Sequence, residues 1–155
     1  MAKKKLDENF VAEVIRQIIE KLEISATIEV SRQDGVFFID ISSEDSSLLI
    51  GKHGTNLESI QFILAVRLKT LTGRDDFELF VDVNNWRRQK EDRLKQLANS
   101  IADKVIREGQ PQTLYNLKSS ERRVIHTVLG DHPRVESVSE GEGVDRHLII
   151  KPKGA

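Results

Sequence analysis

Two glycines, Gly51 and Gly54, interrupt a long stretch of helical periodicity and constrain the fold more than any other feature of the sequence. The apolar run Leu48–Ile50 precedes them, and apolar residues at helical spacing follow them from about Thr55 to Leu71. Glycine tolerates backbone conformations that other residues avoid, so the pair predicts a tight loop between two helices. The second glycine opens a helix whose N–H groups could receive an anion. A P-loop is excluded, because the pattern Gly-x-x-x-x-Gly-Lys-Ser/Thr is absent.

Around this loop, the spacing of apolar residues divides the first half of the chain into six elements in the order αββααβ. The dipeptide Asp34-Gly35 is a strong hairpin signal between the first two strands. The predicted elements are a helix over 8–22, strands over 27–31 and 36–41, a short helix capped by Ser42 or Ser43 and ending at Ile50, a helix over 55–71 and a strand over 77–83.

The second half of the chain predicts a smaller module of order αβαββ. Its predicted elements are a helix capped by Asn84 or Asn85 and reaching Arg107, a strand over 112–117, a helix capped by Ser119 or Ser120 and ending at Leu129, and strands over 135–139 and 146–151. The fold class is therefore α+β, with one domain at residues 5–83 and a second at residues 84–152.

Charge is divided unevenly between these halves. Residues 1–83 hold ten Lys and Arg against fifteen Asp and Glu, whereas residues 84–155 hold fourteen against ten. Basic residues crowd the first half of the helix that begins near residue 84, at Arg87, Arg88, Lys90, Arg93 and Lys95. This distribution favours the second half for contact with phosphates. Ordinary variation of surface charge would explain the same difference.

Composition excludes several classes of protein. The chain has no Cys, so it has no disulfide, no thiolate zinc site and no cysteine nucleophile. The basic start Met-Ala-Lys-Lys-Lys has no apolar segment after it, so it does not predict a signal peptide. The apolar runs are far too short for a membrane span. We therefore expect a cytoplasmic protein.

With the glycine loop in this position, residues 8–83 resemble a KH domain of the second type. The resemblance implies that Gly51, Lys52, His53 and Gly54 clamp the backbone of about four nucleotides. It also implies that Ile50 and Leu57 line an apolar groove floor and that the strand over 36–41 reads base edges. A plain corner between two helices, built with glycine for its freedom in φ, is the alternative interpretation.

A second short motif, Arg122-x-x-x-His126, lies in the predicted helix that ends at Leu129. Residues four apart share one face of a helix, and Arg123 lies on the neighbouring stripe. Arginine can fork two hydrogen bonds onto a phosphate, and histidine can donate to a phosphate or stack on a base. A solvated helix face, with the histidine near its end, is the alternative interpretation.

The sequence around this motif resembles the R-three-H domain of the bacterial Jag/EloR (SpoIIIJ-associated) family, in which that domain directly follows a KH domain. The resemblance rests on Ser120–His126, Asp131–Pro133, Val138–Glu142 and Arg146. Members of that family often carry a further N-terminal domain, which we expect to be lacking here. The resemblance implies a role in gene regulation and cell elongation, and a partner protein with a single KH domain.

We therefore predict a bacterial RNA-binding protein whose two modules bind single-stranded RNA, or single-stranded DNA. The predicted nucleic-acid-binding residues are Ile50, Gly51, Lys52, His53, Gly54, Arg87, Arg88, Arg122, Arg123 and His126. The alternative is a protein-interaction adaptor that kept a KH fold and lost RNA binding, which the acidic N-terminal half favours.

Catalysis, a metal and a cofactor are not predicted. The histidines His126, His132 and His147 fit no zinc spacing, and no cysteine supports them. The acidic cluster Asp75, Asp76, Glu78 and Asp82 predicts a solvated face, with Glu78 and Asp82 pointing outward from a strand. A nuclease would need a second base or a metal site beside Arg122 and His126, and the sequence offers neither.

Overall fold

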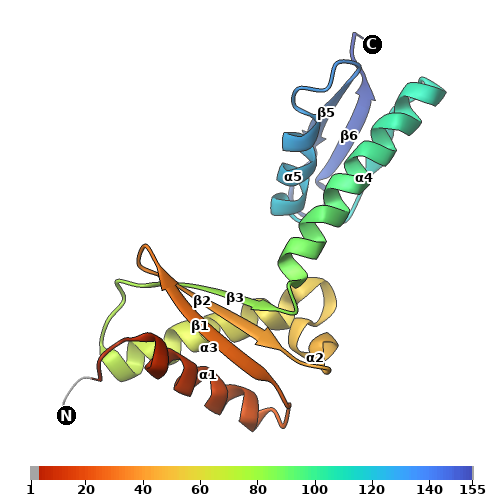
Figure 1. Ribbon diagram of the computed structural model, residues 1–155. Coiled ribbons are helices and arrows are strands. Elements are labelled where there is room, and N and C mark those ends of the chain that lie inside the picture. Colours follow the sequence, from red (N-terminus) through yellow and green to blue (C-terminus); the bar gives the residue numbers. More distant parts are fainter. Residues whose placement is uncertain (1–3, 155) are drawn as a thin grey trace. The chain divides into compact units, whose positions relative to one another are not determined.

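The computed structural model describes residues 4–154, and the chain packs into two compact units, one ending at Arg87 and one beginning at Arg88 (Figure 1). This division lies four residues after the boundary expected between residues 83 and 84, and the domain limits of 5–83 and 84–152 stay a prediction. Each unit has its own hydrophobic core and combines helices with a three-stranded sheet, which confirms the α+β class. The basic start at residues 1–3 lies outside the described residues.

The first unit has the predicted order αββααβ. Its elements are α1 (Glu8–Lys21), β1 (Thr27–Gln33), β2 (Val36–Ser42), α2 (Ser46–Ile50), the 3-10 turn η1 (Lys52–Gly54), α3 (Thr55–Thr72) and β3 (Glu78–Val83). The strands form a sheet of order β1-β2-β3, in which β2 runs antiparallel to β1 and parallel to β3. The central strand is therefore hydrogen-bonded to a neighbour on each side.

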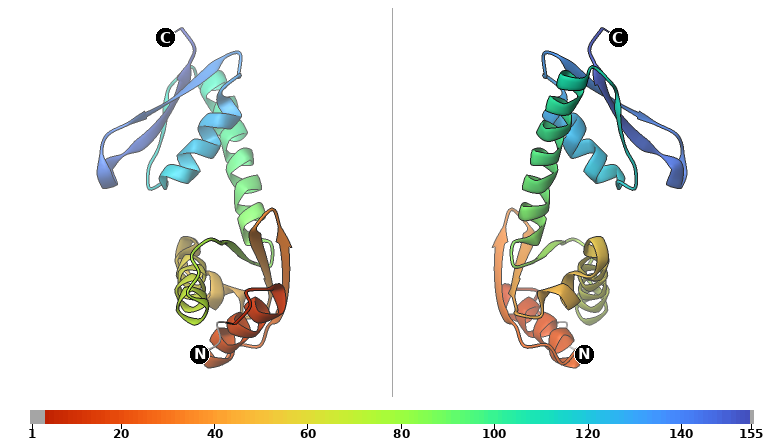
Figure 2. Two further views of the ribbon diagram at one scale, coloured as in Figure 1. Left: turned by 90° about the vertical axis from the view of Figure 1, so that its left-hand side faces the viewer. Right: turned by 90° about the vertical axis from the view of Figure 1, so that its right-hand side faces the viewer.

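Helices α1 and α3 pack on one face of this sheet (Figure 2). Helix α1 begins after Asp7, whose carboxylate accepts a hydrogen bond of 3.0 Å from the Phe10 N–H. Alternation along β2 turns Phe37, Ile39 and Ile41 inward, and all three are buried against apolar residues of both helices. The opposite face of the sheet carries the side chains between them, Phe38 and Asp40.

The second unit has the predicted order αβαββ. Its elements are α4 (Trp86–Glu108), of which the first two residues belong to the first unit, β4 (Gln112–Leu114), α5 (Ser119–Leu129), β5 (Val135–Glu140), the 3-10 turn η2 (Gly143–Asp145) and β6 (His147–Pro152). The three strands form an antiparallel sheet of order β4-β6-β5. The core joins α4, α5 and this sheet through Ala98, Ala102, Val105, Ile125, Leu129, Val135, Leu148 and Ile150.

The strand expected over residues 112–117 is wrong in its length, because β4 ends at Leu114. Asn116 adopts a left-handed backbone conformation with φ of 58°, which cannot continue a strand. Two further residues then carry the chain into α5.

The expected serine caps are wrong at the starts of α2 and α5. The Asn84 side chain, at the start of α4, accepts a hydrogen bond of 3.1 Å from the Ser43 N–H and donates one of 2.8 Å to the Ser43 carbonyl, and capping of α4 by Asn84 or Asn85 stays a prediction. The Asp82 carboxylate also accepts a hydrogen bond of 3.2 Å from the Arg87 N–H in the first turn of α4. Helix α5 is capped at Lys118, whose N–H donates to the Glu121 carboxylate at 2.7 Å.

At α2 the residue before the helix is Asp45, and neither predicted serine occupies that position. The Ser43 hydroxyl accepts from the Asp45 N–H and donates to the Ser25 carbonyl, so it fixes the loop before the helix. None of the helices within residues 4–154 combines the length and apolar character needed to cross a membrane.

Candidate nucleic-acid interface

The first glycine of the loop is required by its own backbone and by one side chain. Gly51 has φ of 70° and ψ of −173°, a region that is essentially restricted to glycine. A Cβ atom there would lie 2.5 Å from Cγ of Asn56. The Asn56 amide cannot move away freely, because it donates a hydrogen bond of 2.8 Å to the Leu48 carbonyl. Asn56 therefore holds the end of α2 against the loop.

The second glycine is required in the same way. Gly54 is left-handed with φ of 80°, and a Cβ atom there would lie 2.4 Å from the Trp86 ring. Trp86 packs in turn against the core of the first unit. Internal packing thus explains why both positions are glycine, and the case for a ligand rests on what the loop exposes.

The loop exposes its two central residues, Lys52 and His53. His53 has a left-handed backbone with φ of 54°, and the Thr55 hydroxyl donates to the Lys52 carbonyl at 2.9 Å. Ile50 beside the loop is half-buried against the core. Lys52 and His53 are therefore presented on a turn that internal contacts hold in shape.

For the groove expected beside the loop, one prediction is wrong and a second is restricted by the strand pairing. Leu57 is completely buried in the core, so the expectation that it lines an open groove floor is wrong. Strand β2 is paired along its length with both β1 and β3, so its main chain is closed to a ligand. Base reading by residues 36–41 stays a prediction that only outward side chains, such as exposed Asp40, could fulfil.

Arg87, an expected phosphate ligand, is engaged within the first unit. Its Nε donates to the Val81 carbonyl at 2.9 Å, a terminal nitrogen donates to the Gln61 amide oxygen at 3.3 Å, and the guanidinium lies 5.2 Å from the centre of the Phe80 ring. Arg88, the next residue, belongs to the second unit and is exposed. The two arginines are therefore in different settings.

The second unit brings Arg122, Arg123 and His126 together on one pocket of about 640 Å³. Helix α5 supplies these three, β5 supplies two serines, and β6 with the turn before it supplies a further arginine. The pocket is lined by Ser119, Arg122, Arg123, His126, Ser137, Val138, Ser139, Arg146 and Leu148. Three arginines around hydroxyl groups form a cavity suited to a phosphate or another anion.

Neighbouring groups hold the pocket's side chains in place. The Arg122 guanidinium donates to the Leu117 carbonyl, and Nδ1 of His126 lies 2.8 Å from the Ser137 hydroxyl. Because Ser137 engages Nδ1, Nε2 is the ring nitrogen left for a ligand. Nε of Arg146 donates to the Ser139 hydroxyl at 3.2 Å. The strand serines thus orient one cationic and one titratable side chain.

Arg146, Ser137 and Ser139 were not among the predicted site residues. Arg146 stands in the string that carries the R-three-H resemblance, so its place in the motif was a usable signal. The serines lie two apart on β5 and therefore share one face of the strand with buried Val135. Polar residues on the core side of a strand were the sequence signal for them.

A partly buried ion pair lies at the start of α5. Glu121 is 8% exposed, and one of its oxygens lies 2.8 Å from Nζ of Lys90 on α4. Burial opposes ionisation of this carboxyl, but the hydrogen bonds from Lys90 and from the Lys118 N–H outweigh it and hold the pKa of Glu121 below its usual value. The carboxylate thereby ties α4 to the helix that carries Arg122 and His126.

The remaining histidines have structural roles. Nδ1 of His132 accepts hydrogen bonds from the Arg134 and Val135 N–H groups, both at 3.2 Å, and Nδ1 of His147 lies 2.8 Å from the Asp145 carbonyl. Within residues 4–154, no three His, Asp or Glu side chains form a group that could hold a metal ion.

The acidic cluster near residue 76 is only partly the solvated face that we expected. Asp75 and Asp76 are exposed and pair with Lys69 and Arg74 at 3.3 and 2.7 Å. Asp82 is 6% exposed, so the expectation that it points into solvent is wrong. Its carboxylate accepts from the N–H groups of Val83 and Arg87, which makes it a cap for α4.

Comparison with known proteins identifies both units. The family model of the KhpA/KhpB KH domain matches residues 8–74, and that of the R-three-H domain matches residues 92–152. The chain is 30% identical over 141 residues to the RNA-binding protein KhpB of Bacillus subtilis, covering 90% of this chain and 67% of that protein.

Two further relatives carry the same name. Identity is 28% over 143 residues to the RNA-binding protein KhpB of Clostridium symbiosum, and 28% over 133 residues to that of Lactiplantibacillus plantarum. The matches cover 91% and 86% of this chain, but only 64% and 41% of those two relatives. With a KH domain followed by an R-three-H domain and this similarity along nearly its whole length, the chain belongs to the KhpB family, the Jag/EloR family that its sequence resembles.

Proposed function

We propose that this chain binds single-stranded RNA through two sites, one on each unit. The observation that carries the proposal is the pocket on which Arg122, Arg123, His126 and Arg146 converge. Arginine forks onto phosphate oxygens, and the hydroxyls of Ser119, Ser137 and Ser139 add donors beside them. The pocket therefore takes a backbone phosphate of the RNA, with His126 donating to the phosphate or stacking on a base.

The loop at Gly51–Gly54 is the second proposed site. Exposed Lys52 supplies a cation, exposed His53 supplies a donor or a stacking surface, and the packed glycines keep the turn in one shape. Each site by itself needs only modest affinity, because a strand held by one unit is presented to the other at high effective concentration. The relatives' name, RNA-binding protein, supports the same function.

Fluorescence anisotropy with a labelled single-stranded RNA of random sequence tests this function. We expect the variants Lys52→Asp/His53→Asp and Arg122→Ala/His126→Ala each to bind more weakly than the wild type. Binding should also weaken with salt, at a slope of roughly −0.7 per phosphate contact on logarithmic axes. Equal binding by all three proteins, or binding by none, would refute the proposal and favour the adaptor function. A single-stranded DNA of matched length measures the preference between the two nucleic acids.

The same proposal has no place for catalysis, a metal or a cofactor, and it places the protein in the cytoplasm with a role in gene regulation and cell elongation. RNA of unchanged length after prolonged incubation with the protein is the expected result of a test for cleavage. Shortened RNA would overturn the non-catalytic assignment.

A partner protein with a single KH domain is part of the proposal. Helix α3 exposes Phe62, Ile63 and Val66 by 70%, 50% and 48%, an apolar surface on the KH unit away from the core. Such a patch on a KH fold is suited to the equivalent helix of a second KH fold. Replacing Phe62 by Glu should abolish co-purification with that partner while the affinity for RNA at the Arg122–His126 pocket is retained, and an unchanged complex would contradict this surface.

A further inference from the structure

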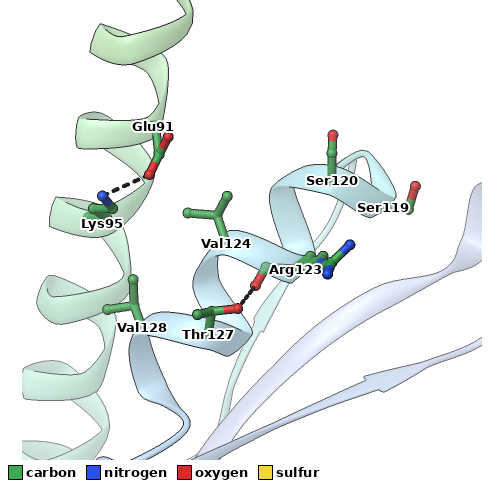
Figure 3. A pocket seen from close by; sticks show the side chains of 8 residues that line it. All are labelled: Glu91, Lys95, Ser119, Ser120, Arg123, Val124, Thr127 and Val128. Carbon is green, nitrogen blue, oxygen red and sulfur yellow. Dashed lines mark hydrogen bonds and ion pairs between the residues drawn. The ribbon is translucent and has the colours of Figure 1, made fainter. Parts of the chain in front are cut away.

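A second hollow lies beside the Arg122–His126 pocket, between α4 and α5, with a volume of about 530 Å³ (Figure 3). It is lined by Glu91, Lys95, Ser119, Ser120, Arg123, Val124, Thr127 and Val128. Ser119 and Arg123 also line the first pocket, so the two hollows meet along one edge of α5. We call this hollow the interhelix groove.

The groove combines an apolar floor with polar sides. Val124 and Val128 project from α5 toward α4, as Figure 3 shows. Hydroxyls from Ser119, Ser120 and Thr127 lie along α5, and the Thr127 hydroxyl donates to the Arg123 carbonyl at 2.8 Å. A nucleoside has the same mixture of faces, since its base and sugar carbons are apolar while its hydroxyls and phosphate are polar.

The groove carries net positive charge, which suits a nucleotide, but one of its cations is already paired with a carboxylate. Lys95 and Arg123 contribute two cations to one anion, Glu91. Glu91 forms an ion pair with Lys95, in which a carboxylate oxygen lies 2.7 Å from the Lys95 Nζ. Both side chains are about half exposed. A phosphate that approaches Lys95 must therefore compete with Glu91 for the same ammonium group.

We infer that the interhelix groove is a second nucleotide subsite, which receives the nucleotide adjoining the one in the Arg122–His126 pocket. Arg123, shared by both hollows, contacts the phosphate that links the two nucleotides. The base or ribose lies on Val124 and Val128. Lys95 leaves its ion pair with Glu91 and contacts the next phosphate of the strand. This inference rests on the proposed RNA binding and adds the path of the strand over the second unit.

Two substitutions with opposite expected signs test the groove in the full-length chain. Lys95→Gln should weaken binding of a decauridylate RNA about two- to fivefold, as expected for the loss of one exposed charge contact. Its salt slope should also fall by about 0.7. Glu91→Gln should strengthen binding about twofold, because the Lys95 ammonium no longer has a competing carboxylate.

Matched controls lie at the other end of α4. Arg107 and Glu108 are an ion pair of 3.6 Å that lines neither hollow. Arg107→Gln and Glu108→Gln change charge by the same amounts on the same helix, so they measure the general effect of charge. The groove is refuted if Lys95→Gln and Glu91→Gln change the affinity no more than their respective controls do.

Amide signals in NMR spectra of the isotope-labelled full-length chain locate the strand directly. Uridine monophosphate, a single nucleotide, should shift the signals of Ser137 and Ser139 beside the first pocket. The decauridylate should shift these and also those of Val124, Thr127 and Val128. If the longer RNA leaves the amide signals of Val124, Thr127 and Val128 unshifted, the subsite is refuted.

The variant Arg122→Ala/His126→Ala separates failure of the subsite from failure of the proposed function. If this variant binds the decauridylate as tightly as the wild type does, RNA binding at the first pocket is wrong, and the groove inference falls with it. If the variant binds weakly while Lys95→Gln and Glu91→Gln match their controls, only the groove inference is wrong.

Discussion

The two units prepare for an anionic ligand by different means. In the KH unit, the shape of the loop comes from packing of Asn56 on Gly51 and of Trp86 on Gly54, and Arg87 is engaged by carbonyl and amide oxygens of its own unit. In the R-three-H unit, side chains from a helix and two strands converge on one pocket. A short motif can thus specify backbone shape in one domain and side-chain convergence in the other.

This difference has a consequence for mutagenesis. Substitution of the two loop glycines acts mainly through folding of the turn. Substitution of the pocket's arginines or of His126 acts mainly on the ligand, because these side chains are exposed or half exposed. Stability should therefore respond to the loop glycines, and RNA affinity to the pocket's charged side chains.

The largest effect on stability is expected for Gly54→Ala. The new methyl group would overlap the Trp86 ring at a left-handed backbone position, which should cost about 2–4 kcal/mol of the free energy of unfolding. Urea unfolding followed by Trp86 fluorescence reports this directly, since it is the only tryptophan in the chain. The control is Gly35→Ala, which has φ of 84° but open space around it and should cost about 1–2 kcal/mol. Equal losses in both variants would show that Trp86 does not restrict Gly54.

The next effect concerns the other unit and depends on pH. Glu121→Gln should destabilise the R-three-H unit by about 1–3 kcal/mol at neutral pH, because it removes the charge that Lys90 faces. Folding lowers the pKa of Glu121, so the stabilisation is present above the ordinary carboxyl pKa of about 4.3 and is lost as the pH falls through the folded value.

Hydrogen exchange at the buried Ile125 amide, followed from pH 7 into the acid range, measures this difference. Glu91→Gln, at the exposed i,i+4 pair with Lys95, is the control and should have a much smaller effect. A loss that is independent of pH would mean that the ionised carboxylate does not carry the stabilisation.

Two arginine substitutions, one in each unit, should have different effects on RNA affinity. Arg146→Gln removes a cation that lines the pocket and should weaken RNA binding about two- to fivefold. Arg87→Gln should leave the affinity unchanged and lower the stability of the KH unit, because its partners are Val81 and Gln61. Anisotropy and Trp86 fluorescence together check both results. Weaker RNA binding by Arg87→Gln without loss of stability would show that this arginine serves the ligand.

The smallest effect is expected for Ser137→Ala. The substitution removes the hydroxyl that lies 2.8 Å from Nδ1 of His126, so the ring loses its fixed orientation. RNA affinity should fall about twofold, within the range expected for one neutral hydrogen bond. Ser100→Ala on the exposed surface of α4 serves as the control, and an effect no larger than that of the control would mean that His126 needs no orientation.

The order of elements was predictable in both units, and the reason is local. Helices and strands each have a characteristic spacing of apolar residues, and this spacing can be read along the sequence. Both predicted orders, αββααβ and αβαββ, are confirmed. The caps of α2 and α5 were wrong, since Asp45 and Lys118 occupy the cap positions in place of the expected serines and Glu121 supplies the carboxylate at α5. Capping depends on which side chain reaches the first turn in three dimensions, and several candidates near each start had suitable chemistry.

The candidate site likewise has features that local sequence patterns predict and features that depend on long-range packing. Both motifs were visible in the sequence alone, because the glycine pair and the Arg122–His126 spacing are each local patterns. Three features needed the folded chain: Leu57 lies in the core, Arg87 is engaged by its own unit, and Arg146 and two strand serines line the same pocket as His126. The last of these features depends on β5 and β6 pairing beside α5, a long-range arrangement that the spacing of residues along one element cannot encode.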